Sequence, residues 1–395
     1  MKLTKKQREI QAKILDTIYV QGPISRIDIA HLTQTTPATV SATTGYLIEQ
    51  EVIEEVGEDS SGVGSGRRKI LLDIKQGHQY FVGVELSEKF IIFCLTDNTA
   101  TLTKKERLTV DPAKKEATFT TETIIQYIQN FIESSDQKKI GAIGIAIPGH
   151  HLPDENQILT NSALWSNLDL NALSEAFDLP VYFENNVKCM VLSKRFFNGN
   201  SKDENFILHH ISRGIFSAYM HEGELFAQEN RLVGEVGHTT IQMDGELCEC
   251  GNRGCLQTFS SEAWLIKKAQ IIYQEIDSTY LRNIVDDEED IDFQILLKAY
   301  KLGDPLIIDL LQQAIQAIAT NIINLFMIID IQTVYVHGHI YEETALFELL
   351  EEIISNRTPL FKSEKEIKLK KIPYSPFNGA MGASALCISE TYTKY

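Results

Sequence analysis

Apolar residues follow a helical period in the first fifty residues of the chain and then change to short strand-like runs. The spacing between Thr4 and Tyr19 predicts an amphipathic helix, which Gly22-Pro23 ends. Ser25 is placed to cap a second, short helix, whose expected inward positions are Ile27, Ile29, Ala30 and Leu32.

A third helix is predicted to begin at Thr36-Pro37 and to run through Glu51, because threonine is a favoured N-cap and proline fits the first helical position. Its apolar stripe of Val40, Leu47 and Ile48 leaves small and hydroxylated residues outward, of a size that fits a DNA major groove. Two strands around a Gly- and Ser-rich turn follow and predict a wing. Residues 1–72 therefore read as a winged helix-turn-helix domain. The alternative interpretation is a three-helix packing module with a solvated basic loop.

The expected DNA contacts of this head are a few cations and small polar side chains. Arginines near the second helix and on the wing are suited to phosphates or to a narrow minor groove. The third helix has no Lys or Arg, so base recognition would depend on hydroxyl and methyl groups. The predicted DNA-binding residues are Arg26, Thr36, Ala38, Thr39, Ser41, Thr43, Arg67 and Arg68.

Strand-like and helix-like segments alternate in the rest of the chain, which predicts mixed α/β layers, with two lobes and a cleft between them. No internal repeat is evident. The longest apolar stretch, Pro305 to Ile329, is interrupted by polar residues, so we expect a buried or amphipathic helix and not a membrane span. The polar first eleven residues do not resemble a signal segment, and a soluble cytoplasmic protein is expected.

The net charge of −17 is unevenly distributed. Residues 1–72 contain nine Lys or Arg and nine Asp or Glu, so the whole acidic excess lies in the remainder. A neutral head on an acidic body is compatible with DNA contact by the head alone.

The strongest local signal is His238 followed by three cysteines within eight residues, Cys248, Cys250 and Cys255. In a reducing compartment such a cluster indicates metal before disulfide. Three thiolates and one imidazole form a closed tetrahedral set, which predicts one structural Zn²⁺ ion without a catalytic role. The alternative is a set of small buried thiols with a separate loop histidine. Just before the cluster, Gly234 to His238 places Glu235 between glycines, which suits acceptance of vicinal sugar hydroxyls.

Taken together, these features resemble the ROK family of bacterial sugar-responsive repressors and sugar kinases. The resemblance rests on the winged head, Pro148-Gly149, Asn161 ahead of Trp165, residues 184–186, the loop at 234–238, the cysteine cluster and residues 379–383. It implies an actin-like, hexokinase-type, two-lobed fold, with lobe 1 at 73–200 and lobe 2 at 201–395, whose last helix returns to lobe 1. By position it implies sugar contacts at Gly149, Asn161, Asn185, Asn186, Glu235, His238 and Gln257.

Three departures from the kinase pattern predict that the chain is not an enzyme. Asn186 stands where the family's kinases carry the catalytic aspartate, and an amide cannot take a proton from a sugar hydroxyl. The first phosphate loop reads Glu-Leu-Ser-Glu-Lys at 85–89, without the glycines that would cradle phosphate, and the second glycine-rich loop is reduced to Ser-Arg-Gly-Ile-Phe-Ser at 212–217. Gln257 replaces a sugar-binding glutamate, so with Asn186 the cleft loses two negative charges.

The sequence thus predicts a repressor of carbohydrate-utilisation genes that binds double-stranded operator DNA as a homodimer or tetramer and responds to a small carbohydrate. Loss of charge at Asn186 and Gln257 suggests tolerance of a phosphorylated or acidic sugar, and a neutral sugar bound with different geometry is the alternative. Two other readings stay open. One is a ROK-type sugar kinase with an appended DNA-binding head, and the other is a repressor controlled by a protein partner.

Overall fold

The computed structural model describes residues 4–58, 69–111, 118–136, 139–160, 162–197, 205–227, 230, 232–329, 331–357 and 366–394. The chain forms two compact units. Unit 1 comprises Met1–Lys202 and Pro376–Tyr395, and unit 2 comprises Asp203–Ser375. The C-terminal segment therefore belongs to the same unit as the N-terminal head.

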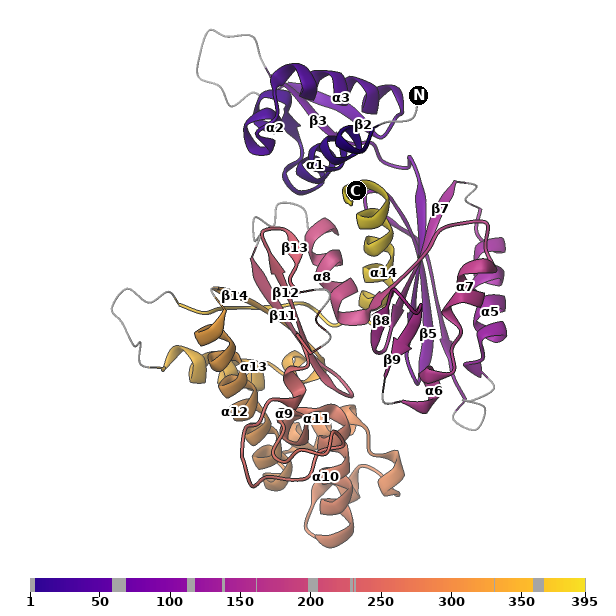
Figure 1. Cartoon of the computed structure of the whole chain (residues 1–395). Helices are drawn as coiled ribbons and strands as arrows, with labels where there is room; N and C mark the ends of the chain where they lie inside the picture. The colour runs from indigo at the N-terminus through magenta and orange to yellow at the C-terminus, as the bar shows by residue number, and fades with distance from the viewer. Residues whose placement is uncertain are drawn as a thin grey trace. The chain divides into compact units, whose positions relative to one another are not determined.

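The head is built from three helices and a small sheet (Figure 1). Each helix begins where a side chain satisfies a free backbone amide: Thr4 and Gln7 form a capping box, while Ser25 and Thr36 accept from Asp28 N and Thr39 N. The strands are paired antiparallel in the order β1-β3-β2. The head elements are α1 (Lys5–Gln21), β1 (Ile24–Ser25), α2 (Arg26–Thr33), α3 (Pro37–Glu49), β2 (Ile53–Glu58) and β3 (Ile70–Ile74).

Two details of the predicted head were wrong. The third helix ends at Glu49, two residues earlier than expected. Of the expected inward positions on α2, Ile29 is fully buried, but the side chains of Ile27 and Leu32 are 65% and 54% exposed. The buried stripe of this short helix is Ile29 and Thr33, one turn apart, and at 3.6 residues per turn Ile27 and Leu32 fall outside it.

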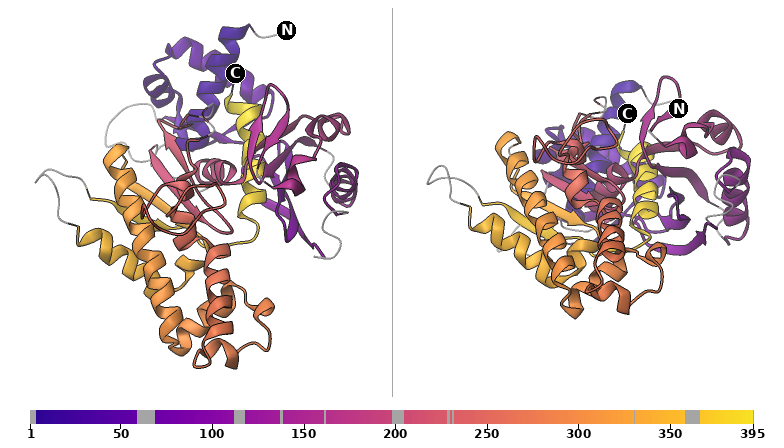
Figure 2. Two further views of the ribbon diagram at one scale, coloured as in Figure 1. Left: turned by 60° about the horizontal axis from the view of Figure 1, so that its bottom comes forward. Right: turned by 90° about the horizontal axis from the view of Figure 1, so that it is seen from below.

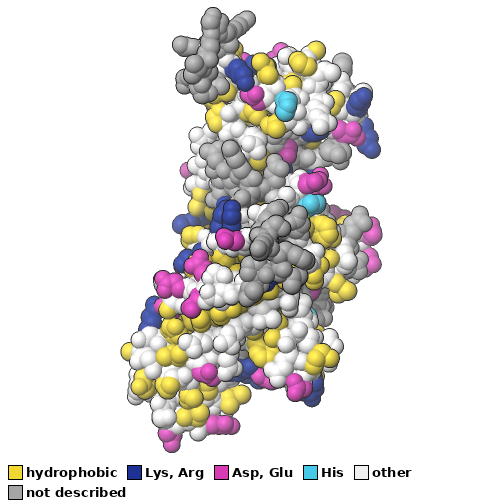
Figure 3. Space-filling model, turned by 90° about the vertical axis from the view of Figure 1, so that its left-hand side faces the viewer, with side chains coloured by type: hydrophobic (Ala, Val, Ile, Leu, Met, Phe, Trp, Pro, Cys, Tyr) yellow, Lys and Arg dark blue, Asp and Glu magenta, His cyan; other side chains and the backbone are white. Residues whose placement is uncertain are grey.

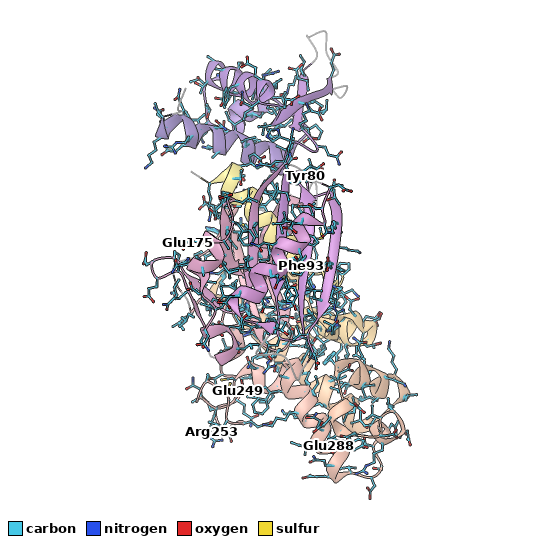
Figure 4. The ribbon with its side chains drawn as sticks, turned by 90° about the vertical axis from the view of Figure 1, so that its right-hand side faces the viewer. Tyr80, Phe93, Glu175, Glu249, Arg253 and Glu288 are labelled. Carbon is cyan, nitrogen blue, oxygen red and sulfur yellow. The ribbon has the colours of Figure 1, made fainter. Side chains whose placement is uncertain are left out.

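The body of unit 1 is a five-stranded sheet in the order β10-β7-β4-β5-β6. Apolar side chains on one face pack against α5 and α7. The opposite face carries α14, whose backbone lies so close that a methyl group at Gly83 would meet Ala380 O at 2.0 Å. The elements are β4 (Tyr80–Leu86), β5 (Phe90–Asp97), β6 (Leu102–Thr109), α5 (Thr121–Glu133), β7 (Ile140–Ile147), β8 (His150–Leu152), β9 (Gln157–Leu159), α6 (Ala163–Ser166), α7 (Leu170–Glu175), β10 (Val181–Asn185), α8 (Asn186–Phe197), α14 (Asn378–Ile388) and the π-helical turn η6 (Ser389–Thr393). Tyr80 and Phe93, labelled in Figure 4, lie on β4 and β5.

Unit 2 has a second five-stranded sheet, in the order β13-β12-β11-β14-β15, with long helices packed against it. Figures 1 and 2 show α12 and α13 side by side. Its strands are β11 (Phe206–Ile211), β12 (Ile215–His221), β13 (Glu224–Leu225), β14 (Thr333–His337) and β15 (Lys368–Lys371). Its helices are α9 (Leu256–Ser260), α10 (Glu262–Glu275), α11 (Phe293–Leu302), α12 (Pro305–Ile328) and α13 (Thr344–Ser355), with short 3-10 turns η2 (Val236–His238), η3 (Tyr280–Asn283), η4 (Glu288–Asp290) and η5 (His339–Glu342).

The apolar stretch after Pro305 forms α12. Within the described residues it is the one helix long and apolar enough to cross a membrane, but half of its most apolar window is buried. Ile307, Leu311 and Ile318 belong to the core of unit 2. This placement is typical of a core helix, as the interrupting polar residues predict.

The two sheets have the same topology, although the sequence shows no repeat. In each five-stranded sheet, the first three strands form an antiparallel meander, a fourth strand pairs in parallel with the first, and a fifth pairs in parallel with the fourth. A duplicated sheet of this kind defines the two-lobed α/β class that the sequence predicts.

Candidate functional site

The predicted metal ligands come together in unit 2. His238 Nδ1 lies 3.6 Å from Cys248 Sγ, and Cys250 Sγ lies 3.6 Å from Cys255 Sγ. All four ligand atoms are within 4.8 Å of one another. A tetrahedral zinc ion with bonds of about 2.3 Å to sulfur and about 2.0 Å to nitrogen separates its ligands by about 3.5 to 3.8 Å. The donor set and its spacing therefore fit a structural zinc ion.

Backbone turns hold the cysteines in this arrangement. Cys248 N donates to Asn252 O at 2.8 Å, and Gly251 N donates to Cys248 O at 2.9 Å. Gly254 has φ +66°, and a methyl group there would lie 1.5 Å from Gln242 O, so only glycine fits. Glu249 and Arg253, labelled in Figure 4, are exposed residues of the same loop.

The chemistry of the thiols also favours a cation. Burial, with the neighbouring Cys250 and Cys248, raises the pKa of Cys255 to about 12. Without a metal this thiol stays protonated at neutral pH, whereas a bound Zn²⁺ ion would displace the proton.

Three predicted sugar residues lie around the same loop of unit 2. The loop packs on β12, where a methyl group at Gly234 would meet the Phe216 ring at 2.3 Å. Glu235 Oε2 lies 4.0 Å from His238 Nε2, the ring nitrogen that faces away from the thiols. A methyl group at Gly237 would lie 3.3 Å from Gln257 Oε1. The geometry thus groups Glu235, His238 and Gln257, with one imidazole nitrogen left for a ligand.

In unit 1 the asparagine pair stands at the start of α8. Asn185 is 5% exposed; its Oδ1 accepts from Val187 N and Lys188 N, and its Nδ2 donates to Gly149 O at 3.0 Å. Asn185 therefore caps the helix and fixes the turn at Gly149, so its side chain is largely engaged. Asn186 is half-buried, and its Oδ1 accepts from Val187 N. Asn161 lies outside the described residues.

Hydrogen bonds engage several amides of the two loops that the sequence places where the family's kinases have phosphate loops. In unit 1, Ser87 N and Ser87 Oγ both donate to Phe90 O, and Phe90 N donates to Ser87 Oγ. In unit 2, Ser212 N donates to Gly214 O, and Ser212 O accepts from Glu262 N. Amides used in this way are not available to cradle phosphate.

α3, the helix predicted to enter the DNA major groove and called the recognition helix below, carries five of the predicted DNA contacts when its N-cap is included. Ala38 and Ser41 are exposed, Thr39 and Thr43 are half-buried, and Thr36 is used as the cap. A shallow hollow of about 360 Å³ is lined by Gln7, Ile10, Ala38, Thr39, Ala42 and Thr43. The start of α1 thus borders the recognition helix. Figure 3 shows Lys and Arg side chains at two edges of the head.

The arginine expected at a phosphate is tied into the head. Arg26 Nη2 contacts Glu55 Oε1 at 2.9 Å, and its Nε donates to Thr44 Oγ1 at 3.0 Å. It therefore joins α2, α3 and β2. Arg67 and Arg68 lie outside the described residues. The exposed cations Lys5 and Lys6, directly before Gln7 of this hollow, were not among the predicted contacts; their signal is the basic start of α1.

The fold and these sites define a winged helix-turn-helix head on a two-lobed α/β body with a His/Cys₃ loop. The family model described as "ROK family" matches residues 81–390. This chain belongs to the ROK family.

Two relatives and two solved structures show what the whole chain is similar to. The xylose repressor of Bacillus spizizenii is 30% identical over 69% of this chain and 73% of that protein. The DNA-binding transcriptional dual regulator NagC of Escherichia coli is 26% identical over 92% and 88%. The crystal structure of a ROK family transcriptional regulator, a homologue of the E. coli MLC protein, matches with TM-score 0.79 and 20% identity over 98% of this chain and 97% of that one. A ROK glucokinase from Streptomyces griseus, in complex with glucose and AMPPNP, matches with TM-score 0.65 and 18% identity over 78% and 98%.

Proposed function

We propose that this chain is a DNA-binding transcriptional repressor of carbohydrate-utilisation genes, regulated by a small sugar bound in its ROK body. The observation that carries the proposal is the head: the relative NagC spans 92% of the chain, whereas the glucokinase leaves a fifth of the chain unmatched. The family model begins at residue 81, after the head ends at Ile74. A head with an open, small-residue recognition helix is suited to a major groove.

We further propose that the body does not phosphorylate the sugar. Asn186 offers an amide where a general base is required, and its Oδ1 is bonded to the first turn of α8. The loops at Ser87 and Ser212 use their own amides in tight turns. These three features, which lie in both units, remove the proton acceptor and both phosphate cradles.

The proposed sugar contacts are Glu235, His238 and Gln257 in unit 2 and the Asn186 end of α8 in unit 1, with Gly149, Asn161 and Asn185 as the remaining predicted contacts. Asn186 and Gln257 are neutral, so the site would tolerate a phosphorylated or acidic sugar, which carboxylates at the same two positions would repel. A neutral sugar held by the same amides is the competing outcome of the test below.

One zinc ion at His238 and its three cysteines would fix the loop that carries Glu235. Residues 1–72 would form the DNA-binding domain, 73–200 the first lobe and 201–395 the second, with the last helix on the first lobe. Two heads of a cytoplasmic homodimer or tetramer would occupy a palindromic operator.

DNA binding is tested by fluorescence anisotropy with labelled DNA duplexes from the promoter region of the gene that encodes this chain. We expect specific binding that weakens with salt, and a change in affinity of about 5-fold or more with one sugar of the panel D-xylose, D-glucose, N-acetyl-D-glucosamine and the 6-phosphates of the two hexoses. Absence of sequence-specific binding would overturn the DNA-binding proposal. Thermal-shift screening that finds no ligand in this panel would favour control by a protein partner, and ATP-dependent turnover of any hexose would establish a kinase.

A further inference from the structure

One helix of unit 1 joins the proposed sugar site to the DNA-binding head. α8 begins at Asn186 and ends at Phe197, so at 1.5 Å per residue its ends are about 18 Å apart. Its first turn is held by Asn185, which also binds Gly149 O. Its last turn contacts α1 of the head.

The contact with the head is a small, specific interface. Arg195 Nη2 donates to Asp16 Oδ2 at 2.7 Å, and Nη1 lies 2.6 Å from Oδ1, so the ion pair is held by one hydrogen bond and one further close contact. The Arg195 side chain is 13% exposed and that of Asp16 30% exposed. The Phe196 ring meets the Tyr19 ring edge-on, with centroids 5.7 Å apart.

The same face of α1 touches the C-terminal segment. Tyr19 Oη donates to Asn98 O at 3.0 Å, and its ring lies 6.0 Å from that of Tyr392 in η6. Asn98 is fully buried, and its Nδ2 donates to Lys75 O in the connection between head and body. Within the described residues, α1 of the head contacts the last turn of α8, the turn η6 that follows α14, and Asn98.

α8 and α14 are locked together along their length. A methyl group at Gly382 would lie 2.6 Å from Cys189 C, so the two backbones are in direct contact. Interfaces packed as closely as this move as one body and do not deform gradually.

We propose that α8, moving with α14, is the mechanical link that transmits occupancy of the sugar site to the head, and that Asp16, Arg195 and Tyr19 are its coupling residues. This inference rests on the proposed function, because it explains how a sugar-regulated repressor of this fold would reposition α1. A displacement of α8 at Asn186 also displaces its other end at Arg195, and the ion pair between Arg195 and Asp16 transmits this displacement to α1.

The link is tested first without sugar or DNA, by hydrogen–deuterium exchange of the α1 amides in the full chain. Asn185→Ala, at the far end of α8, should speed exchange in α1 by about 3-fold or more. The same change should not speed exchange further in an Arg195→Ala background, and the charge swap of Asp16→Arg with Arg195→Asp should restore the effect.

A second perturbation and a control complete the design. Asn185→Asp keeps the capping oxygen and loses the hydrogen bond to Gly149 O, so it should give a milder effect. Arg282→Ala, at a surface ion pair of unit 2, is the matched control and should leave the response intact.

An equal response of α1 with and without Arg195 would overturn the link. The second arm measures operator affinity with and without each sugar of the panel given above, the two hexose 6-phosphates included. The ratio of the two affinities should fall from about 5-fold or more in the wild type to under about 2-fold in Arg195→Ala. If exchange shows the coupling but no sugar changes wild-type operator affinity, sugar regulation fails while the link stands. If wild type and Arg195→Ala respond equally to a sugar, the link is wrong.

Discussion

Acidification should weaken unit 2 and strengthen unit 1, because the imidazoles with the largest pKa shifts lie in unit 2 and the carboxyl group with the largest shift lies in unit 1. In unit 2, burial lowers the pKa of His209 and of His210 to about 4, and burial with neighbouring His210 lowers that of His337 to about 2. His210 Nδ1 and His337 Nδ1 are 2.9 Å apart, an arrangement in which one neutral ring donates to the other. In unit 1, burial raises the pKa of Glu85 to about 7.

The signs follow from proton binding. A histidine in the unfolded chain has a pKa of about 6.5, so below that pH it binds a proton. The buried histidines of folded unit 2 stay neutral at the same pH, and the stability of unit 2 therefore falls as the pH falls. At pH 5 each of the three histidines costs about 2 kcal/mol relative to pH 7.5, and together they cost about 6 kcal/mol if they act independently. In folded unit 1, Glu85 binds a proton near pH 7, whereas a glutamate in the unfolded chain is protonated only near pH 4.5. Unit 1 therefore gains about 2 kcal/mol over the same interval.

The two tryptophans report the units separately. Trp165 is buried in unit 1 and Trp264 in unit 2, so Trp264→Phe leaves a probe of the first and Trp165→Phe a probe of the second. Urea unfolding followed by fluorescence at pH 7.5 and pH 5 should move the Trp264 transition to lower urea and the Trp165 transition to higher urea. His337→Asn should reduce the shift of the Trp264 transition. Equal shifts of both transitions, or nuclear magnetic resonance titration of His337 near pH 6.5, would refute the reasoning.

Three further predictions concern the metal, the helix pair and the lost chemistry. Cys255→Ser should lower bound zinc, measured by mass spectrometry, and the melting temperature of unit 2; unchanged melting of a zinc-free wild type would contradict a structural ion. Gly382→Ala should destabilise unit 1 by about 1 to 3 kcal/mol because its methyl group meets the backbone of Cys189, whereas Gly45→Ala on α3, where the same methyl group meets nothing, should be neutral or stabilising by up to about 1 kcal/mol; equal effects in urea unfolding would be inconsistent with the tight packing. Asn186→Asp should give no ATP-dependent phosphorylation in a coupled assay, because the closed turns remain, and measurable turnover would show that the amide alone blocks the reaction.

The sequence was sufficient wherever one short segment determines the result. Helix starts at Ser25 and Thr36 follow from side chains that satisfy free amides, and the structure confirms both. The His238 and cysteine cluster could be predicted because its ligands are close in sequence, so a single loop brings them together. The alternation of strand-like and helix-like segments after the head could also be predicted, because continuous apolar runs such as that of β7 are a local signal.

Contacts between distant segments were not predictable in this way. Helical periodicity gives an apolar stripe but not the neighbour that covers it, so Ile27 and Leu32 of α2 were assigned inward and are exposed. Arg26 reads as a free cation in the sequence, yet Glu55 and Thr44 reach it only through the fold.

The repeated sheet topology shows most clearly what the sequence leaves undetermined and the tertiary structure decides. The sequence by itself determined the winged head, the metal loop and the family, because these depend on local spacing and particular residue types. Only the tertiary structure decided that both units share one strand order, that α14 packs on the sheet at Gly83, and that Arg195 meets Asp16. Strand pairing and close packing depend on the shape and volume of the side chains. Many different sequences satisfy the same shape and volume, so a single sequence does not reveal which segments pack together.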